Sequence, residues 1–323
     1  MESKYQVIYQ FLNPIKHLIG ESSITEIMIN KPNDVWVKRY GCKSEKVKTE
    51  ISSDQIRGLM TLLASVSNKI ISDEKSIEKN YQIISAAIPG FRFEAWNTPV
   101  SLHGPSMTIR RINKDSISLE NYKDFGTINH ETYLILKKYV TDKRNIIIAG
   151  STGSGKTTFC SSLLNCIDSF ERLIVIENIQ ELNLLTPNVL YLQTDEEQGY
   201  SVNRLLASAL RGLPDRIIIG ELRGIEAEGY LKVANTGHPG SMTTLHANSA
   251  FDALQRLEDM IQSNDSMSQS KSLKNRINAI KPVVIYLSSV IKKSTFLPIV
   301  TEIIEISGVE NGIYSINKIF KYK

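Results

Sequence analysis

The second half of the chain alternates short apolar runs with amphipathic segments. In one of these segments, Val202, Leu205, Leu206 and Ala209 recur at the spacing of one helix face. Strands and helices that alternate in this way are typical of βαβ units, so we expect a mainly parallel sheet in this half. The strand-like runs are NIIIAG at 145–150, LIVIEN at 173–178, RIIIGE at 216–221 and SMTTLHA at 241–247.

The first part of the chain has a different pattern. Apolar residues over 53–70 recur on one helix face, and strand-like runs precede them at 24–30 (ITEIMIN) and 34–40 (DVWVKRY). Strands and helices in this mixed order do not form a regular βαβ repeat. We therefore predict a small α+β domain over residues 1–112.

A polar, turn-rich stretch separates the two patterns. Residues 113–129 (NKDSISLENYKDFGTIN) have the composition of a linker, which places the second domain at 130–323. That domain ends in strand-like text after a further polar stretch. The last strand-like runs are KPVVIYL at 281–287, PIVTEIIEI at 298–306 and GIYSINKIF at 312–320.

Composition narrows the class of protein. A chain of 323 residues with 41% hydrophobic content is long enough for about two globular domains. Its three cysteines form no CxxC pair, which argues against a disulfide framework or a tetracysteine zinc module and favours the cytoplasm. We find no leader-like start and no run of about 18 apolar residues, and expect a protein that is neither exported nor integral to a membrane. The net charge of +4 is too small to indicate a polyanionic partner.

Residues 150–157, GSTGSGKT, fit the phosphate-binding motif G-x-x-x-x-G-K-[ST], between a strand-like run and a helix-like one. Glycines let consecutive backbone N–H groups turn toward one anion at the positive end of the helix. Lys156 would reach the β- and γ-phosphates of ATP, and Thr157 would ligate Mg²⁺. The predicted cradle consists of Ser151, Thr152, Gly153, Ser154, Gly155, Lys156, Thr157 and Thr158.

Polar side chains follow the other strand-like runs at their carboxyl ends, the edge where open parallel sheets bind ligands. Glu177 and Glu181 follow the second run, Glu221 and Arg223 the third, and His246 the fourth. Taken alone, each of these residues could equally be a solvated turn residue or make a structural hydrogen bond. Taken together, they predict one site. The residue directly before Glu221 is Gly220, where an ordinary Walker B strand has Asp, so Glu221 itself must serve the metal-bound water or act as a base.

Four segments carry a resemblance to a known family. GSTGSGKTT, IENIQEL, LRGLPDRIIIGELRG and TGHPGSMTTLHANS, in this order, resemble the Walker A, acidic, Walker B and histidine boxes of the type II and type IV secretion ATPases. The short chain, the missing tetracysteine module and GHPGSMTTLHANS most resemble the VirB-type traffic ATPases, the eleventh VirB component. The resemblance implies a RecA-like P-loop ATPase domain with a mainly parallel sheet, preceded by a smaller α+β domain.

The resemblance also implies roles for single residues. Glu221 would position or deprotonate water, Glu177 would assist, and His246 would sense the γ-phosphate. In the first domain, FRFEAWNTP and SMTIRR resemble the segments that contribute two nucleotide-facing arginines, here Arg92 and Arg110.

Two positions depart from the family pattern. The acidic box usually reads Glu-Asp but here reads Glu177-Asn178, so the second carboxylate is absent. The Walker B element ends in Arg223-Gly224, whereas many pilus motors have Arg-Asp there. The second departure favours a secretion ATPase over a pilus motor.

The expected assembly also rests on the resemblance. It implies a homohexameric ring in the cytoplasm, peripheral on the inner membrane, that contacts other secretion-machine components and moves one domain against the other on turnover. A pilus retraction or assembly motor and a nucleotide-gated scaffold with little turnover stay open as alternatives. A nucleic-acid motor is disfavoured because we see no dense basic stripe with interleaved aromatics, and we expect no direct nucleic-acid binding.

Overall fold

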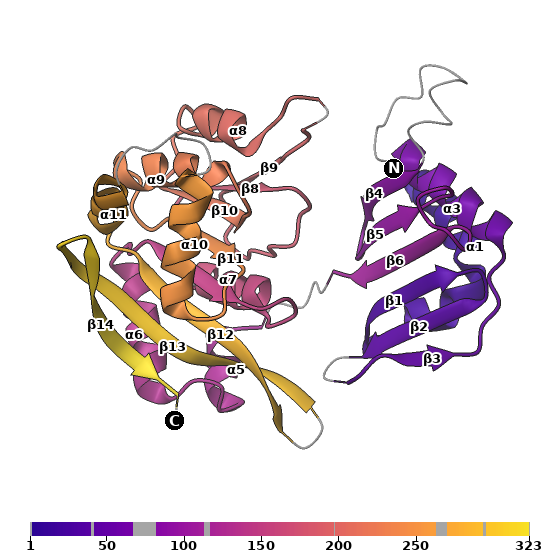
Figure 1. Ribbon diagram of the computed structural model, residues 1–323, viewed down its shortest axis with the longest axis horizontal. Helices are drawn as coiled ribbons and strands as arrows, with labels where there is room; N and C mark the ends of the chain where they lie inside the picture. The colour runs from indigo at the N-terminus through magenta and orange to yellow at the C-terminus, as the bar shows by residue number, and fades with distance from the viewer. Residues whose placement is uncertain are drawn as a thin grey trace. The chain divides into compact units, whose positions relative to one another are not determined.

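The computed structural model describes residues 2–39, 42–66, 82–112, 117–196, 198–262, 270–292 and 295–322. The chain divides into two compact units, both drawn in Figure 1. Met1–Lys114 and Ile291–Phe296 form the first unit, and Asp115–Val290 and Leu297–Lys323 form the second. The buried apolar residues of the two units form separate clusters.

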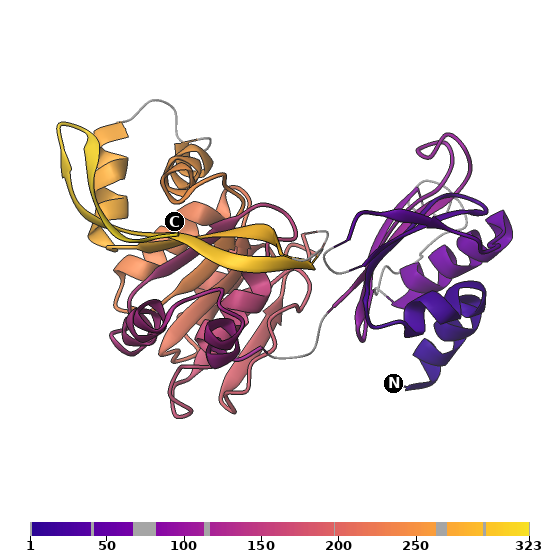
Figure 2. The same cartoon turned by 90° about the horizontal axis from the view of Figure 1, so that it is seen from below.

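The first unit is a six-stranded sheet in the order β3-β2-β1-β6-β5-β4, with helices against one of its faces (Figure 2). In β5, Phe91, Phe93 and Ala95 are buried in the core and the residues between them are only half-buried. This period of two buries one face of an antiparallel sheet. The elements are α1 (Glu2–Phe11), a 3-10 turn (Asn13–Ile15), α2 (Lys16–Gly20), β1 (Ile24–Lys31), β2 (Asp34–Arg39), β3 (Glu45–Val47), α3 (Ser53–Val66), β4 (Ile83–Ile88), β5 (Phe91–Trp96) and β6 (Ser106–Arg111).

The early strand and helix predictions are confirmed where the structure describes them. The runs at 24–30 and 34–40 are β1 and β2, and α3 occupies the first part of the helix predicted over 53–70. In α3, Ile56, Leu59 and Leu63 are completely buried. Residues 67–70 of the predicted helix and residue 40 of the predicted strand lie outside the described residues.

The second unit is built on an eight-stranded sheet in the order β14-β13-β12-β7-β11-β10-β8-β9. From β12 to β9 the neighbours in that order pair in parallel, which confirms the predicted mainly parallel sheet. Among the described pairings of this sheet, only β13 and β14, at the other edge, pair antiparallel. The strands are β7 (Ile146–Gly150), β8 (Leu173–Glu177), β9 (Val189–Gln193), β10 (Arg216–Leu222), β11 (Met242–Leu245), β12 (Val283–Lys292), β13 (Thr295–Glu310) and β14 (Ile313–Lys321).

Helices cover both faces of the second sheet. Ile147 of β7 packs in a cluster with α8 to α11, whereas its neighbours Ile146 and Ile148 pack in a cluster with α5 to α7. Burial on both faces explains why these strands are continuous apolar runs. The helices are α5 (Leu119–Asp124), α6 (His130–Thr141), α7 (Lys156–Leu164), α8 (Val202–Ala209), α9 (Glu226–Asn235), α10 (Ala250–Gln262) and α11 (Ser270–Ala279).

The segment expected as a linker, 113–129, contains helix α5. Leu119 and Tyr122 of α5 are buried in the core of the second unit, and the division between the units falls after residue 114. Ser118 and Asn121 form a capping box at the start of this helix. Polar residues that resemble a linker in the sequence therefore serve here as helix caps.

The strand-like tail is confirmed as β12, β13 and β14. Across the described part of the chain, no helix combines the length and the apolar character that a membrane span requires.

Candidate functional site

The predicted phosphate-binding loop connects β7 to α7. β7 ends at Gly150 and α7 begins at Lys156. Gly153 and Gly155 have φ angles of 76° and 85°, left-handed values that residues with a Cβ rarely adopt, so the loop turns sharply before the helix. Gly155 is the N-cap of α7, and no described side chain caps this helix end. The first N–H groups of α7 are therefore available to an anion.

The loop side chains fit a phosphate cradle. Ser154 is buried, and its Oγ has no hydrogen-bond partner among the described residues. A buried hydroxyl with an unused donor, beside a helix N-terminus, suits a phosphate oxygen. Thr157 and Thr158 are half-buried on the first turn of α7, and the exposed tip of the loop consists of Ser151, Thr152 and Gly153.

Lys156 is buried at the base of the loop. Its Nζ donates to the backbone oxygens of Gly150 and Ser151, both at 2.9 Å, and lies 3.3 Å from Nδ1 of His246. A buried ammonium needs such acceptors, because an unpaired charge is costly away from water. The loop thus holds the lysine charge beside the cradle.

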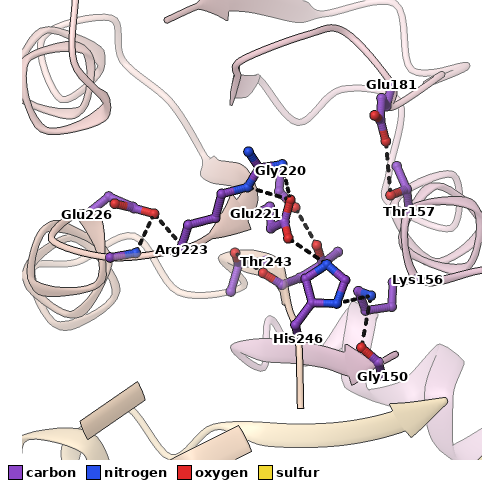
Figure 3. Close-up of polar contacts among 12 residues, drawn as sticks. Gly150, Lys156, Thr157, Glu181, Gly220, Glu221, Arg223, Glu226, Thr243 and His246 are labelled. Atoms are coloured by element: carbon purple, nitrogen blue, oxygen red, sulfur yellow. Dashed lines mark hydrogen bonds and ion pairs between the residues drawn. The ribbon is translucent and has the colours of Figure 1, made fainter. Parts of the chain in front are cut away.

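His246 connects the loop to Glu221 (Figure 3). Nε2 of His246 lies 3.0 Å from Oε1 of Glu221, on the opposite side of the ring from Lys156. A lysine can only donate and an ionised carboxylate can only accept. Both contacts are satisfied by the neutral imidazole that carries its proton on Nε2. The pKa of His246 is lowered by burial and then by the Lys156 ammonium, with the Glu221 carboxylate opposing them, and the neutral ring is consistent with that shift.

Glu177, at the end of β8, stabilises the loop that follows this strand. It is 8% exposed, and its Oε1 accepts hydrogen bonds from the backbone N–H groups of Glu181 and Leu182, both at 3.1 Å. Oε2 is buried and has no hydrogen-bond partner among the described residues. Burial raises the pKa of Glu177 from its ordinary value of 4.5 to about 7; the nearby Glu181 raises it further, and the two N–H bonds oppose the rise.

Gly220 explains why the Walker B strand lacks the usual aspartate. A Cβ at this position would lie 2.8 Å from Cγ of Glu177 on the neighbouring strand, closer than real Cβ contacts come. A side chain at 220 would therefore displace the buried glutamate. The glycine makes room for Glu177, and Glu221 is the next carboxylate along β10.

Glu181 is the carboxylate that reaches the loop. Oγ1 of Thr157 donates to Oε2 of Glu181 at 3.4 Å (Figure 3). A carboxylate four residues beyond Glu177 therefore lies beside the loop, whereas position 178 carries an asparagine. Oxygen ligands of this kind suit Mg²⁺. Within the described residues, no group of three or more His, Cys, Asp or Glu side chains is placed to hold a metal ion.

Two further polar residues lie close to Glu221: Arg223, which the sequence places in the predicted site without an individual role, and Glu226, which the sequence pattern does not single out. Nε and Nη2 of Arg223 donate to Oε2 of Glu221 at 2.9 Å and 2.6 Å. Oε1 of Glu226 accepts from the backbone N–H groups of Arg223 and Gly224, at the start of α9. The sequence signal for Glu226 is an acidic residue in the first turn of a helix, after a glycine.

Arg92 and Arg110 lie in the first unit, directly opposite each other on β5 and β6. Arg110 is also opposite Glu26 of β1, and its Nε and Nη2 donate to Oε1 of Glu26 at 3.1 Å and 2.8 Å. The structure therefore brings the two predicted arginines together. The other predicted residues gather in the second unit, at the carboxyl ends of β7, β8, β10 and β11.

This edge of the second sheet defines the class of protein, a RecA-like P-loop nucleotide-binding protein. Comparison of the sequence with protein families then gives the family. The family described as "Type II/IV secretion system protein" matches residues 10–281, and the chain belongs to it. The resemblance drawn from the four boxes is confirmed, and the match covers residues of both units.

Known relatives are similar over most of their length. The conjugal transfer protein TrbB of Rhizobium radiobacter is 30% identical over 303 residues, 92% of this chain and 88% of the relative. The type IV secretion system protein VirB11 of Bartonella quintana is 31% identical over 299 residues, 80% of this chain and 82% of the relative. The crystal structure of the pilus retraction motor PilT with bound ADP shares the fold, with a TM-score of 0.64, 22% identity and coverage of 89% of this chain and 80% of that one.

Proposed function

We propose that this chain is an ATPase that powers transport through a type IV secretion or conjugal transfer machine. The observation that carries the proposal is the chain of contacts from Lys156 through His246 to Glu221, because it connects the phosphate-binding loop to a carboxylate that can receive a proton. The matched family and the names of the relatives, a conjugal transfer protein and a type IV secretion protein, support the transport role.

Residues 151–158 would cradle the phosphates of ATP. The N–H groups at the start of α7 and the Ser154 hydroxyl, which have no side-chain partner among the described residues, would donate to phosphate oxygens, and Lys156 would place its charge on the β- and γ-phosphates. These donors are held by the fold before substrate arrives. Little reorganisation is then needed when charge develops in the transition state.

Glu221 would act as the general base. The oxygen of a water forms a bond to the γ-phosphorus while the water proton passes to Glu221; the bond from that phosphorus to the bridging oxygen breaks, and its electron pair leaves with ADP. Neutral His246 donates to Glu221 and accepts from Lys156. If Lys156 shifts toward the phosphate, Nδ1 of His246 loses this donor. His246 would sense the γ-phosphate in this way.

Thr157 and Glu181 would hold Mg²⁺, with Glu221 reaching it through water. When bound, Mg²⁺ neutralises charge on the phosphate oxygens. Glu177 would assist by holding the loop that presents Glu181, because it accepts the backbone N–H groups of that loop.

The first unit and the assembly complete the proposal. Arg92 and Arg110 would close on the nucleotide from the first domain, since a guanidinium offers a planar fork of donors to phosphate oxygens. The subunits would form a homohexameric ring in the cytoplasm, peripheral on the inner membrane, in contact with other components of the machine. Residues 1–112 and 130–323 would then be the moving domains.

Phosphate release from the purified chain tests the proposal, with and without DNA. We expect turnover without DNA, and a loss of roughly 10²-fold or more in Glu221→Gln with nucleotide binding retained, because a general base contributes about that factor. Glu228→Gln, a carboxylate on α9 that pairs with Arg276, is the matched control and should keep parent activity. A parent that binds ATP without turnover would support a scaffold, and turnover that requires DNA would support a nucleic-acid motor.

A further inference from the structure

Both oxygens of Glu221 are held, but by different kinds of partner (Figure 3). Oε2 accepts two hydrogen bonds from Arg223, at 2.9 Å from Nε and 2.6 Å from Nη2. Oε1 faces the single Nε2–H of His246 at 3.0 Å. A carboxylate oxygen offers about two lone pairs, so Arg223 fills Oε2 while Oε1 keeps one position for a further donor.

The backbone places Arg223 where it can do this. β10 ends at Leu222, and Arg223 follows it directly, two residues after Glu221. Glu226 accepts the N–H groups of both Arg223 and Gly224, which anchors the main chain where α9 begins. The Arg223 side chain is 57% exposed, whereas the Glu221 side chain is 22% exposed. The arginine therefore reaches back from solvent over a carboxylate that is largely enclosed.

We propose that Arg223 is the positioning residue for Glu221: it occupies Oε2 and fixes the carboxylate plane, so that Oε1 is the oxygen that receives the proton of the attacking water. An arginine has donors only and stays charged, so it cannot take that proton itself. The inference rests on the proposed role of Glu221 as base. Beyond that role, it identifies Oε1 as the oxygen that reacts and Arg223 as the side chain that selects it.

Steady-state phosphate release and equilibrium binding of a non-hydrolysable ATP analogue by the full chain test the inference. Arg223→Ala should lower kcat about ten- to a hundred-fold, the range of a charge-assisted hydrogen bond, with analogue binding unchanged. Arg223→Lys should recover part of the loss, because one point charge replaces a planar fork. Arg276→Ala, which removes an exposed arginine from an ion pair with Glu228, is the matched control and should keep the parent kcat.

A double variant separates positioning from a merely structural role. Glu221→Gln with Arg223→Ala should be no slower than Glu221→Gln alone, because an arginine that acts through Glu221 has nothing left to position. Additive losses, a parent-like kcat in Arg223→Ala, or a raised KM at constant kcat would each overturn the inference. If Glu221→Gln itself keeps parent activity, the proposed general base is wrong. If Glu221→Gln is slow but Arg223→Ala keeps the parent kcat, the inference about Arg223 is wrong and the proposed function stands.

Discussion

The two sheets of this protein carry polar groups in different places. In the first sheet, Glu26, Arg92 and Arg110 lie within three adjacent strands, where Arg110 stands opposite both other residues. In the second sheet, β7 and β8 are buried at every position, and the polar groups stand where the strands end. The difference follows from how many faces each sheet buries.

A sheet covered on one face can carry charge along its whole open face, because every second side chain is free to meet solvent or a ligand. A sheet covered on both faces has no such positions, because a charged side chain there would enter a hydrophobic core. Only its edges remain for chemistry, and loops at the carboxyl ends converge there. This difference in burial supports the proposal that catalysis takes place at the second sheet and that the first sheet assists it.

The largest expected effect is at Lys156. Lys156→Ala should reduce phosphate release by roughly 10²-fold or more, because it removes a charge held in place for the transition state. Lys156→Met, which keeps most of the side-chain volume, should show the same loss if the fold survives. Circular dichroism and thermal unfolding check the fold of both variants.

Lys232→Ala is the control for this result, since Lys232 is an exposed lysine on α9 that pairs with Glu228. It should keep the parent rate. Normal turnover in both Lys156 variants would mean that the edge of the second sheet is not the active site.

The next effect concerns the open face of the first sheet. Arg110→Ala should weaken ATP binding or slow turnover about ten- to a hundred-fold, because a charge-assisted hydrogen bond to phosphate is lost. Arg110→Lys should restore only part, since the fork of donors is absent. If the contact is to the γ-phosphate, affinity for ADP should fall less than affinity for ATP in a binding titration.

Arg57→Ala is the matched control in the first unit, because Arg57 is as exposed as Arg110 and pairs with Asp54 on the same helix. It should behave as the parent does. An Arg110→Ala variant with parent affinity and turnover would make the first sheet a docking platform without a catalytic contribution.

The smallest effect is a pH dependence of stability from Glu177. Its pKa rises from an ordinary value of 4.5 to about 7 in the folded chain, so the folded state binds this proton more tightly than the unfolded state does. Stability from this group is therefore present at low pH and lost as pH rises from about 4.5 to 7. Glu177→Gln should melt a few degrees higher than the parent at pH 8, and the difference should shrink toward pH 5.

Glu181→Gln serves as the control, because this carboxyl group lies on the same loop and is less buried than that of Glu177, so its melting difference from the parent at pH 8 should be smaller than that of Glu177→Gln. A difference between Glu177→Gln and the parent that is the same at pH 5 and pH 8 would show that Glu177 does not carry the buried proton.

Much of the second unit could be predicted because its signals are local. The runs before Gly150, Glu177 and Glu221 are apolar throughout, which is what burial on both faces requires, and the loop motif lies directly after one of them. β9 gave no comparable signal in the sequence. It is an edge strand, and none of its residues is fully buried, so its sequence does not need a continuous apolar run.

Contacts across the sheet could not be predicted in the same way. Glu177 was assigned a catalytic part, yet its carboxylate accepts hydrogen bonds from its own loop, and Glu181 is the residue that reaches Thr157. Both glutamates follow the same strand, and their spacing alone does not say which one the loop turns toward the helix. The pairing of Arg223 with Glu221 depends in the same way on how the chain leaves β10.

The sequence by itself determined the alternation of strands and helices, the position of the phosphate-binding loop and the list of polar groups at strand ends, because periodicity, glycine conformation and helix N-terminal chemistry are properties of neighbouring residues. Only the tertiary structure decided which of those groups touch. The Lys156–His246–Glu221 contacts join the start of α7, the end of β11 and the end of β10, which are far apart in the chain, and Gly220 is explained by Glu177 on another strand. Hydrogen bonds act over about 3 Å, and distances of that size between remote residues are set by the packing of the whole sheet.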